Sequence, residues 1–310
     1  MSTLHIDRKG AALDADGGTL TVRLDGTLAA RLPLGPVERV VVSGQATLST
    51  RLLAELWSRD VGLLVLSGRG GEATARLVGR PHDDVALRLA QYRLTTQPSA
   101  AASRARALVA AKLRAQARLL QRGRDRRPDR SYDMRVAGDV LDTILTRLAD
   151  PAQTFDLATL NGLEGAAAAA YFNAFQTLFA PALGFAGRRR RPPPDPVNVC
   201  LSLGYTLLHH EAVREAQIVG LDPMLGFLHA PERGRESLAC DLVEPLRPHV
   251  DEWVWQRFAD RDLRPEHFTV MPDGACLMGK AGRATFYDRF ELLARGLRRL
   301  LRRQTRFLAA

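Results

Sequence analysis

The chain has 310 residues, 46% of them hydrophobic, and a formal net charge of +10. This length allows one large domain or two smaller ones, and the apolar fraction is enough for a sizeable core. No apolar run reaches the roughly 18 residues of a membrane span, and residues 1–7 lack the apolar centre of a secretory signal, so we expect a cytoplasmic protein with no membrane segment.

The first 80 residues have the pattern of a small sheet domain. Residues 19–24 alternate between apolar and polar side chains, and the Asp25-Gly26 pair that follows is a strong hairpin signal. Ser49 is placed to cap a single helix. Further short strands are expected at residues 28–32, 37–42, 62–66 and 73–78. The sequence therefore predicts a β-rich N-terminal domain over residues 1–82.

After Pro81-His82-Asp83-Asp84 the pattern changes to helical periodicity. Helical segments are expected at 85–92, 103–121, 141–148, 160–179, 197–219, 238–255 and 290–307, with a short hairpin within 265–283. The charged segment 122–130 and the proline-rich segment 185–194 are expected to be mobile. The predicted fold class is α+β, in which the small β-rich domain precedes a larger all-helical catalytic domain over residues 83–310.

The three cysteines, Cys200, Cys240 and Cys276, are odd in number and widely spaced. This spacing argues against a disulfide framework or a zinc ribbon. They are expected to be small buried residues in a reducing compartment.

Arginine dominates the basic residues, because only three of the 44 Lys and Arg residues are Lys. A GC-rich genome explains that ratio equally well, but not the net positive excess. Arg-rich runs at 101–130, 188–191 and 292–310 favour a phosphate-binding surface over three unrelated solvated faces. Aromatic residues make up only 6% of the chain, so contacts to the nucleic-acid backbone should dominate over base stacking.

Candidate site residues lie in three short stretches of the second domain. Glu164 precedes an alanine-rich run and is expected in the first turn of a helix, where the helix dipole alone would account for it. Asp241 and Glu244 are three residues apart on a predicted helix, so they form either a carboxylate pair that needs a cation or a solvated acidic face beside Arg235 or Arg247.

His229 follows Gly226-Phe227-Leu228 in a predicted loop or helix end. A lone histidine is more often a hydrogen-bonded structural residue than a ligand. If the three stretches meet, carboxylate oxygens with one imidazole suit Mg²⁺ or Mn²⁺ better than zinc.

Taken in order, four blocks of sequence resemble the CRISPR-associated integrase/endonuclease family, the first Cas protein of the adaptation machinery. The blocks are Gly162 to Gly165 with Tyr171-Phe172, Arg191 to Asn198 with Leu201 to Leu208, Gly220 to Pro223 with Gly226 to His229, and Ser237 to Pro245 with Arg247-Pro248. They span about 90 residues.

The resemblance implies a set of site residues. The catalytic set is Glu164, His229, Asp241 and Glu244, of which Glu164, His229 and Glu244 would ligate Mg²⁺ or Mn²⁺. The last motif position is more often Asp in the family, so it stays open whether Asp241 or Glu244 is the third direct ligand. Further implied residues are Tyr205 and Asn198 as supports, and Arg188, Arg189, Arg190, Arg191 and Arg247 as DNA contacts.

The resemblance also implies a function and an assembly. The protein would be a metal-dependent integrase/endonuclease that inserts short DNA fragments into a CRISPR array by 3′-hydroxyl transesterification on double-stranded and branched DNA. It would form homodimers through the N-terminal domain and a heterohexamer with a small ferredoxin-like companion Cas protein. The alternatives are a non-catalytic basic helical protein that binds or shapes DNA, and an inactive family member that retains only the fold.

Overall fold

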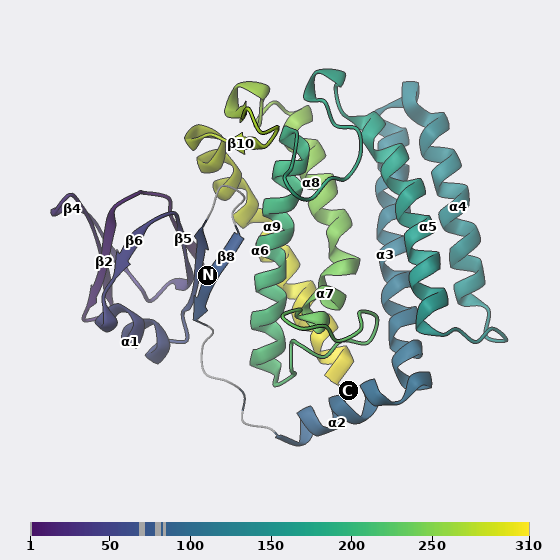
Figure 1. Ribbon diagram of the computed structural model, residues 1–310, viewed down its shortest axis with the longest axis horizontal. Helices are drawn as coiled ribbons and strands as arrows, with labels where there is room; N and C mark the ends of the chain where they lie inside the picture. The colour runs from purple at the N-terminus through teal and green to yellow at the C-terminus, as the bar shows by residue number, and fades with distance from the viewer. Residues whose placement is uncertain (1, 68–71, 78–81, 83–84, 310) are drawn as a thin grey trace. The chain divides into compact units, whose positions relative to one another are not determined.

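The structure is a computed structural model that describes residues 2–67, 72–77, 82 and 85–309. The chain divides into two compact units, residues 1–83 and 84–310. The first is rich in strands and the second is mostly helical, which confirms the predicted fold class (Figure 1). Among the described helices, none combines the length and the apolar character needed to cross a bilayer.

Two four-stranded sheets form the first unit. One has the strand order β1 (Ser2–Ile6), β5 (Val37–Ser43), β7 (Gly62–Ser67) and β8 (Glu72–Leu77). Its first two pairings are parallel and the last is antiparallel. The other has the order β4 (Thr27–Pro33), β3 (Thr19–Leu24), β2 (Ala11–Asp16) and β6 (Ala46–Leu48), and only β2 and β6 pair in parallel.

Two local predictions for this unit are confirmed. Asp25 and Gly26 join β3 to β4 with positive φ angles of 49° and 78°, the left-handed conformation that this pair adopts readily in a tight hairpin. Ser49 caps helix α1 (Thr50–Ser58), since its side chain accepts a hydrogen bond of 3.0 Å from the Leu52 amide.

Three strands, β1, β2 and β6, were not predicted individually. β1 and β6 pair with strands that are distant in sequence, β5 and β2, whereas β2 forms a local hairpin with β3. The predicted strand at 73–78 overlaps β8, but residue 78 lies outside the described residues. Of the predicted boundary Pro81-His82-Asp83-Asp84, only His82 is described.

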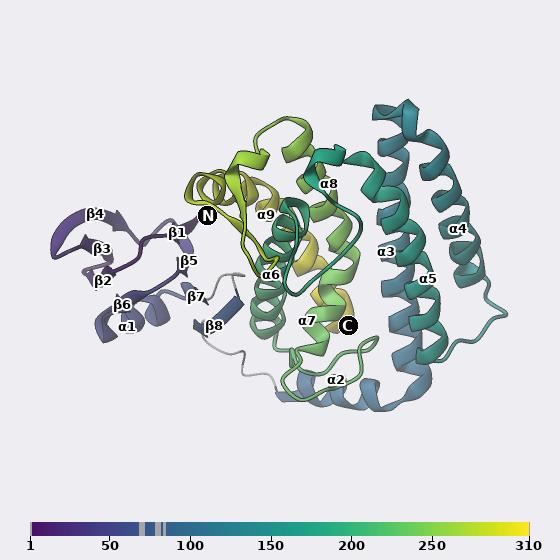
Figure 2. The ribbon, with the colours of Figure 1, turned by 45° about the horizontal axis from the view of Figure 1, so that its top comes forward.

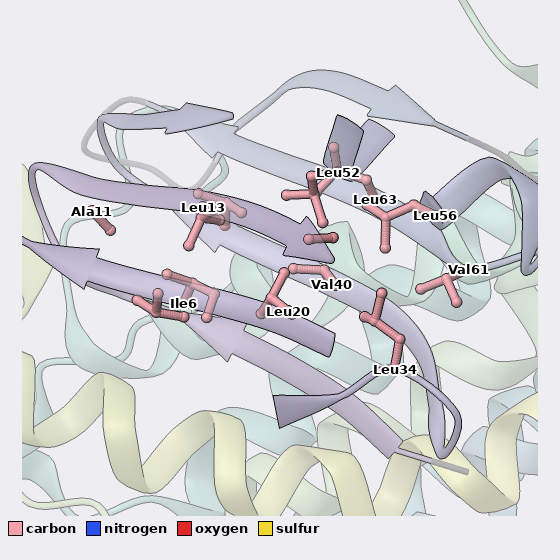
Figure 3. Packing of buried hydrophobic residues seen from close by; sticks show 13 residues of the cluster. Ile6, Ala11, Leu13, Leu20, Leu34, Val40, Leu52, Leu56, Val61 and Leu63 are labelled. Atoms are coloured by element: carbon pink, nitrogen blue, oxygen red, sulfur yellow. The ribbon is translucent and has the colours of Figure 1, made fainter. Parts of the chain in front are cut away.

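The core of this unit is a cluster of aliphatic side chains from both sheets and α1 (Figure 3). Leu13, Leu20, Leu52 and Leu56 are at most 2% exposed. Alternate residues of β2 are buried, as expected for a strand with one face on the core. Every second side chain along such a strand therefore points into the core, where it packs against one face of the short helix α1.

Replacing Leu20 by Ala should lower the free energy of unfolding of this unit by about 2–5 kcal/mol, because a cavity would remain in a closed core. Hydrogen exchange of the β2 and β3 amides would measure the loss. Leu28→Ala is the matched control, since Leu28 is 42% exposed on β4, and should change the value by only about 0.5 kcal/mol. Equal effects of the two substitutions would contradict this account of the core.

The second unit consists mainly of long helices. They are α2 (Val85–Thr96), α3 (Pro98–Arg126), α4 (Ser131–Ala149), α5 (Leu157–Phe175), α6 (Pro196–Val219), α7 (Ser237–Val243), α8 (Arg247–Ala259) and α9 (Lys280–Ala309). Helices α3, α4 and α5 pack side by side in both views, and α6 packs against α7, α8 and α9 (Figures 1 and 2).

Short 3₁₀ helices and one hairpin complete the second unit. The 3₁₀ helices are η1 (Pro128–Arg130), η2 (Gln176–Leu178), η3 (Pro181–Leu183), η4 (Glu244–Leu246) and η5 (Pro265–His267). The predicted hairpin is confirmed as β9 (Phe268–Val270) and β10 (Cys276–Met278). The last helix begins at Lys280, ten residues earlier than predicted.

Two predictions for this unit are wrong. The segment 122–130, expected to be disordered or mobile, is helical instead, because α3 continues to Arg126 and η1 follows it. The predicted helix 238–255 is divided into α7, η4 and α8, because Pro245 and Pro248 lack the backbone N–H that an uninterrupted helix needs. Asp241 and Glu244 therefore lie on different elements.

Candidate active site

Glu164 lies inside α5, not in its first turn. The helix begins at Leu157, and its N-cap is Asp156, whose carboxylate accepts a hydrogen bond of 2.8 Å from the Thr159 amide. The dipole at the helix start acts only within the first turn, so it does not account for Glu164. That part of the sequence interpretation is wrong, and the role of this carboxylate has to come from its tertiary neighbours.

A buried lysine joins Glu164 to Glu244. The Lys112 ammonium, on α3, donates hydrogen bonds to Glu164 Oε1 and to Glu244 Oε2, so helix α5 and the 3₁₀ turn η4 meet at one cation. The Lys112 and Glu244 side chains are only 10% and 7% exposed. Sequence reasoning missed Lys112 because it grouped this residue with the arginines of 101–130; its signal was a lone lysine in an Arg-rich helix.

The Glu244 carboxylate has a second cationic neighbour, Arg247, whose Nε lies 3.1 Å from Glu244 Oε1. Burial by itself would raise the pKa of Glu244, but Arg247 and Lys112 outweigh it and lower that pKa to about 2. Burial likewise opposes the charge of Lys112, yet Glu244 and Glu164 raise its pKa. Glu244, Lys112 and Arg247 therefore stay ionised at neutral pH.

Asp241 organises the loop that carries His229. Its two oxygens accept hydrogen bonds from the backbone amides of Phe227 (2.5 Å), Leu228 (2.9 Å) and His229 (3.0 Å). His229 Nδ1 lies 2.7 Å from Asp241 Oδ1. The Asp241 side chain is fully buried, so the alternative of a solvated acidic face is wrong. A carboxylate that contacts Nδ1 fixes the orientation of the imidazole ring. The second ring nitrogen, Nε2, takes no part in this contact.

Gly226 is required by this packing. A Cβ at position 226 would lie 2.7 Å from Asp241 Oδ2 and 2.7 Å from the Ser237 carbonyl carbon, closer than real contacts allow. The loop is also held from α2, where Gln91 donates hydrogen bonds to the carbonyls of Asp222 (2.9 Å) and Leu225 (2.8 Å). The histidine is thus positioned from both sides of its loop.

Tyr205, expected to support the site, lies beside Arg247. The Arg247 guanidinium is 4.8 Å from the centre of the Tyr205 ring, and the Tyr205 hydroxyl donates to Asp251. Tyr171 donates to the other Asp251 oxygen at 2.8 Å. Burial raises the pKa of Asp251 to about 6, although hydrogen bonds from Tyr205 and Tyr171 oppose the rise. Asp251 had no signal in the sequence, because an acid beside Glu252 in a helix is usually exposed to solvent.

Asn198 holds the segment 185–194 and does not contact the carboxylates of the site. Its side chain accepts hydrogen bonds from the Arg189 amide (2.8 Å) and from Arg188 Nη1 (2.9 Å), and donates to the Gly187 carbonyl (2.9 Å). This segment was expected to be disordered or mobile, but the structure gives it specific hydrogen bonds to Asn198. It has no helix, as its prolines predict, but it is fastened to the start of α6.

The described residues contain no group of three or more His, Cys, Asp or Glu side chains close enough to hold one metal ion. The structure does bring Glu164 and Glu244 to one ammonium, and it orients the His229 ring through Asp241. Two carboxylates that converge on a cation, with an oriented imidazole beside them, fit the chemistry of a hard divalent ion.

The fold and these contacts define a class: a two-unit α+β protein with an acidic, histidine-containing site in its helical unit. The model of the family described as "CRISPR associated protein Cas1" matches residues 4–292. The chain belongs to this family.

Two curated relatives are 36% identical to the chain. "CRISPR-associated endonuclease Cas1 1" of Thermodesulfovibrio yellowstonii aligns over 94% of this chain and 91% of its own length. "CRISPR-associated endonuclease Cas1 2" of Rhodospirillum rubrum aligns over 92% and 84%.

Among solved structures, a Cas1 protein from Thermotoga maritima has a TM-score of 0.85 at 21% identity, over 100% of this chain and 96% of its own. A casposase bound to integration product has the same score and identity, over 100% and 91%. At this identity the likeness is one of fold.

The raised pKa of Asp251 leads to a pH-dependent prediction. The native protein binds this proton more tightly than the unfolded chain, so ionisation of Asp251 lowers the free energy of unfolding as pH rises from about 4 to about 6. Asp251→Asn lacks this ionisation. Between pH 4 and pH 7 its free energy of unfolding should therefore shift by about 2 kcal/mol in its favour relative to the wild type.

Urea unfolding followed by the fluorescence of Trp253 and Trp255, both on α8, would measure this shift. Asp142→Asn, at an exposed position of α4, is the control and should follow the wild type at both pH values. A difference between Asp251→Asn and wild type that stays constant with pH would contradict the prediction.

Proposed function

We propose that this protein is a metal-dependent DNA integrase/endonuclease that inserts short DNA fragments into a CRISPR array. The observation that carries the proposal is the meeting of Glu164 and Glu244 at one buried cation, together with the orientation of His229 by Asp241. The names of the curated relatives support the same activity, since they are CRISPR-associated endonucleases.

In this proposal Glu164, His229 and Glu244 hold Mg²⁺ or Mn²⁺, and Asp241 orients His229. What favours Glu244 over Asp241 as the third ligand is that both Asp241 oxygens are occupied by three backbone amides and the His229 ring. Withdrawing Asp241 from them would release the 226–229 loop. Glu244 has only side-chain partners, which can rearrange.

The reaction is an attack by a 3′-hydroxyl of the incoming fragment on a phosphodiester of the repeat: a new P–O bond forms, the P–O bond to the 3′-oxygen of the target strand breaks, and that oxygen leaves as a free 3′-hydroxyl after it takes up the proton that the attacking hydroxyl gives up. When bound, the divalent ion supplies positive charge that lowers the pKa of that hydroxyl and offsets charge developing on the phosphoryl oxygens. Arg247, held over Tyr205 and paired with Glu244, keeps the Glu244 carboxylate in place. With water as the nucleophile, the same site would cleave branched DNA.

The DNA contacts proposed for the arginines fall into two groups. Arg188 donates hydrogen bonds to Asn198 and to Ser202 Oγ, the latter at 3.0 Å, so its main role in this proposal is to hold the segment 185–194 in place. Arg189, Arg190 and Arg191 are exposed, which leaves them accessible to phosphates on double-stranded DNA.

Part of the basic run in α9 pairs with acids of the same unit. Arg298 contacts Glu211 and Glu291, and Arg302 contacts Glu215 on α6. These arginines stabilise the packing of α9 on α6, so their charge contributes less to a DNA surface than the sequence count indicates.

We also propose the assembly that the family resemblance implies: a homodimer formed through the N-terminal unit, joined to a small ferredoxin-like companion Cas protein in a cytoplasmic heterohexamer. A solved Cas6-RT-Cas1–Cas2 complex supports this by fold, with a TM-score of 0.82 at 21% identity over 99% of this chain and 34% of that one.

One observation favours a second candidate, a non-catalytic DNA-binding protein. Lys112 and Arg247 already neutralise the carboxylates of the site, as they would in a purely structural ion cluster. Strand joining that depends on a divalent ion separates the two candidates.

Glu164→Gln preserves the shape of the side chain and removes its charge, so it should lower the rate of fragment joining in Mg²⁺ or Mn²⁺ by more than about 100-fold. The measurement is the joining of a labelled fragment to a repeat-containing duplex, with and without chelator. Glu232→Gln is the control, because the Glu232 side chain is 69% exposed, and it should join DNA at the wild-type rate. Undiminished joining by Glu164→Gln would refute the assignment.

A further inference from the structure

Lys112 differs in chemistry from the residues around it. The other basic residues of α3 are all arginines, and Lys112 is one of three lysines in the whole chain. A lysine ammonium is a compact point charge, whereas a guanidinium is a broad planar fork. A compact cation with three donors can sit between two carboxylates, and Lys112 does so between Glu164 and Glu244.

The charges of this cluster balance without any further ion. Glu164 and Glu244 are matched by Lys112 and Arg247, and both Glu244 oxygens already face a cation. A divalent ion that binds the same two carboxylates would add two positive charges within a few ångströms of the ammonium. Like charges this close in a poorly solvated site repel strongly.

We propose that Lys112 and the divalent ion compete for Glu164 and Glu244: the ammonium holds the carboxylate pair together before the ion arrives and leaves it when the ion binds. This inference rests on the proposed function, since it concerns the same site. Lys112 is then a positioning residue that pre-forms the ligand pair. It also weakens the binding of the ion, because each binding event has to break one buried and one part-buried ion pair.

Two consequences distinguish this role from a merely structural one. Without Lys112 the two carboxylates would repel each other, so the protein alone should be less stable. The same variant should bind a divalent ion more tightly, because the Lys112 ammonium no longer competes for the two carboxylates. A residue that only stabilised the fold would lower stability without any gain in affinity.

The test is a direct Mn²⁺ titration of the full chain, read from the electron paramagnetic resonance signal of free Mn²⁺, with thermal unfolding in parallel. Lys112→Met should lower the Mn²⁺ dissociation constant by roughly 5–150-fold, the usual range of coupling between two ligands. Its melting temperature should fall below wild type without Mn²⁺ and rise further than wild type with it.

Three further variants sharpen the test. Lys112→Gln is neutral but keeps hydrogen-bond donors; it should gain affinity like Lys112→Met and serves if that variant folds poorly. Lys112→Arg keeps the charge and should show no gain. Lys280→Met removes the same charge from an exposed position at the start of α9, so its affinity should equal that of wild type.

Unchanged or weaker Mn²⁺ binding by both neutral Lys112 variants would overturn the inference. If wild type still joins DNA in a Mn²⁺-dependent manner, that result leaves the proposed function standing. A wild type that neither binds Mn²⁺ nor joins DNA, together with Lys112 variants that also fail to bind, would overturn the proposed function as well.

Discussion

The buried charge of Glu244 is the constraint on which the helical unit depends. An isolated carboxylate at this depth would cost several kcal/mol, so the chain has to deliver compensating charges to it. Lys112 comes from α3 and Arg247 from the start of α8, and Lys112 also contacts Glu164 on α5. One carboxylate therefore ties together three helices and the 3₁₀ turn between α7 and α8.

The second organising group is Asp241, and its partners are mainly backbone amides. A carboxylate that accepts three amide hydrogen bonds fixes the path of a loop more rigidly than one that pairs with a flexible side chain. Gly226 makes that close approach possible, and Gln91 holds the preceding turn. The two acids of one short sequence block thus have different tasks: Asp241 shapes the loop, and Glu244 pairs with the side-chain cations of Lys112 and Arg247.

Local patterns were enough to predict much of the fold. The alternation at 19–24, the Asp25-Gly26 turn and the Ser49 cap each depend on neighbouring residues, and each is confirmed. Errors arose where local patterns competed. Apolar periodicity predicted one helix over 238–255, whereas Pro245 interrupts it.

The order of the sequence blocks identified the family, and the residue types indicated an oxygen-rich cation site. Composition and spacing could go no further, because contacts between residues 52 and 132 positions apart do not show in a local pattern. Packing of α3 against α5 and η4 placed Lys112 between Glu164 and Glu244. Folding of the 226–229 loop over α7 brought its backbone amides to Asp241. The burial of Asp241 and Glu244, which strengthens the electrostatic interactions of both carboxylates, results from the packing of the helices and cannot be read from the local sequence.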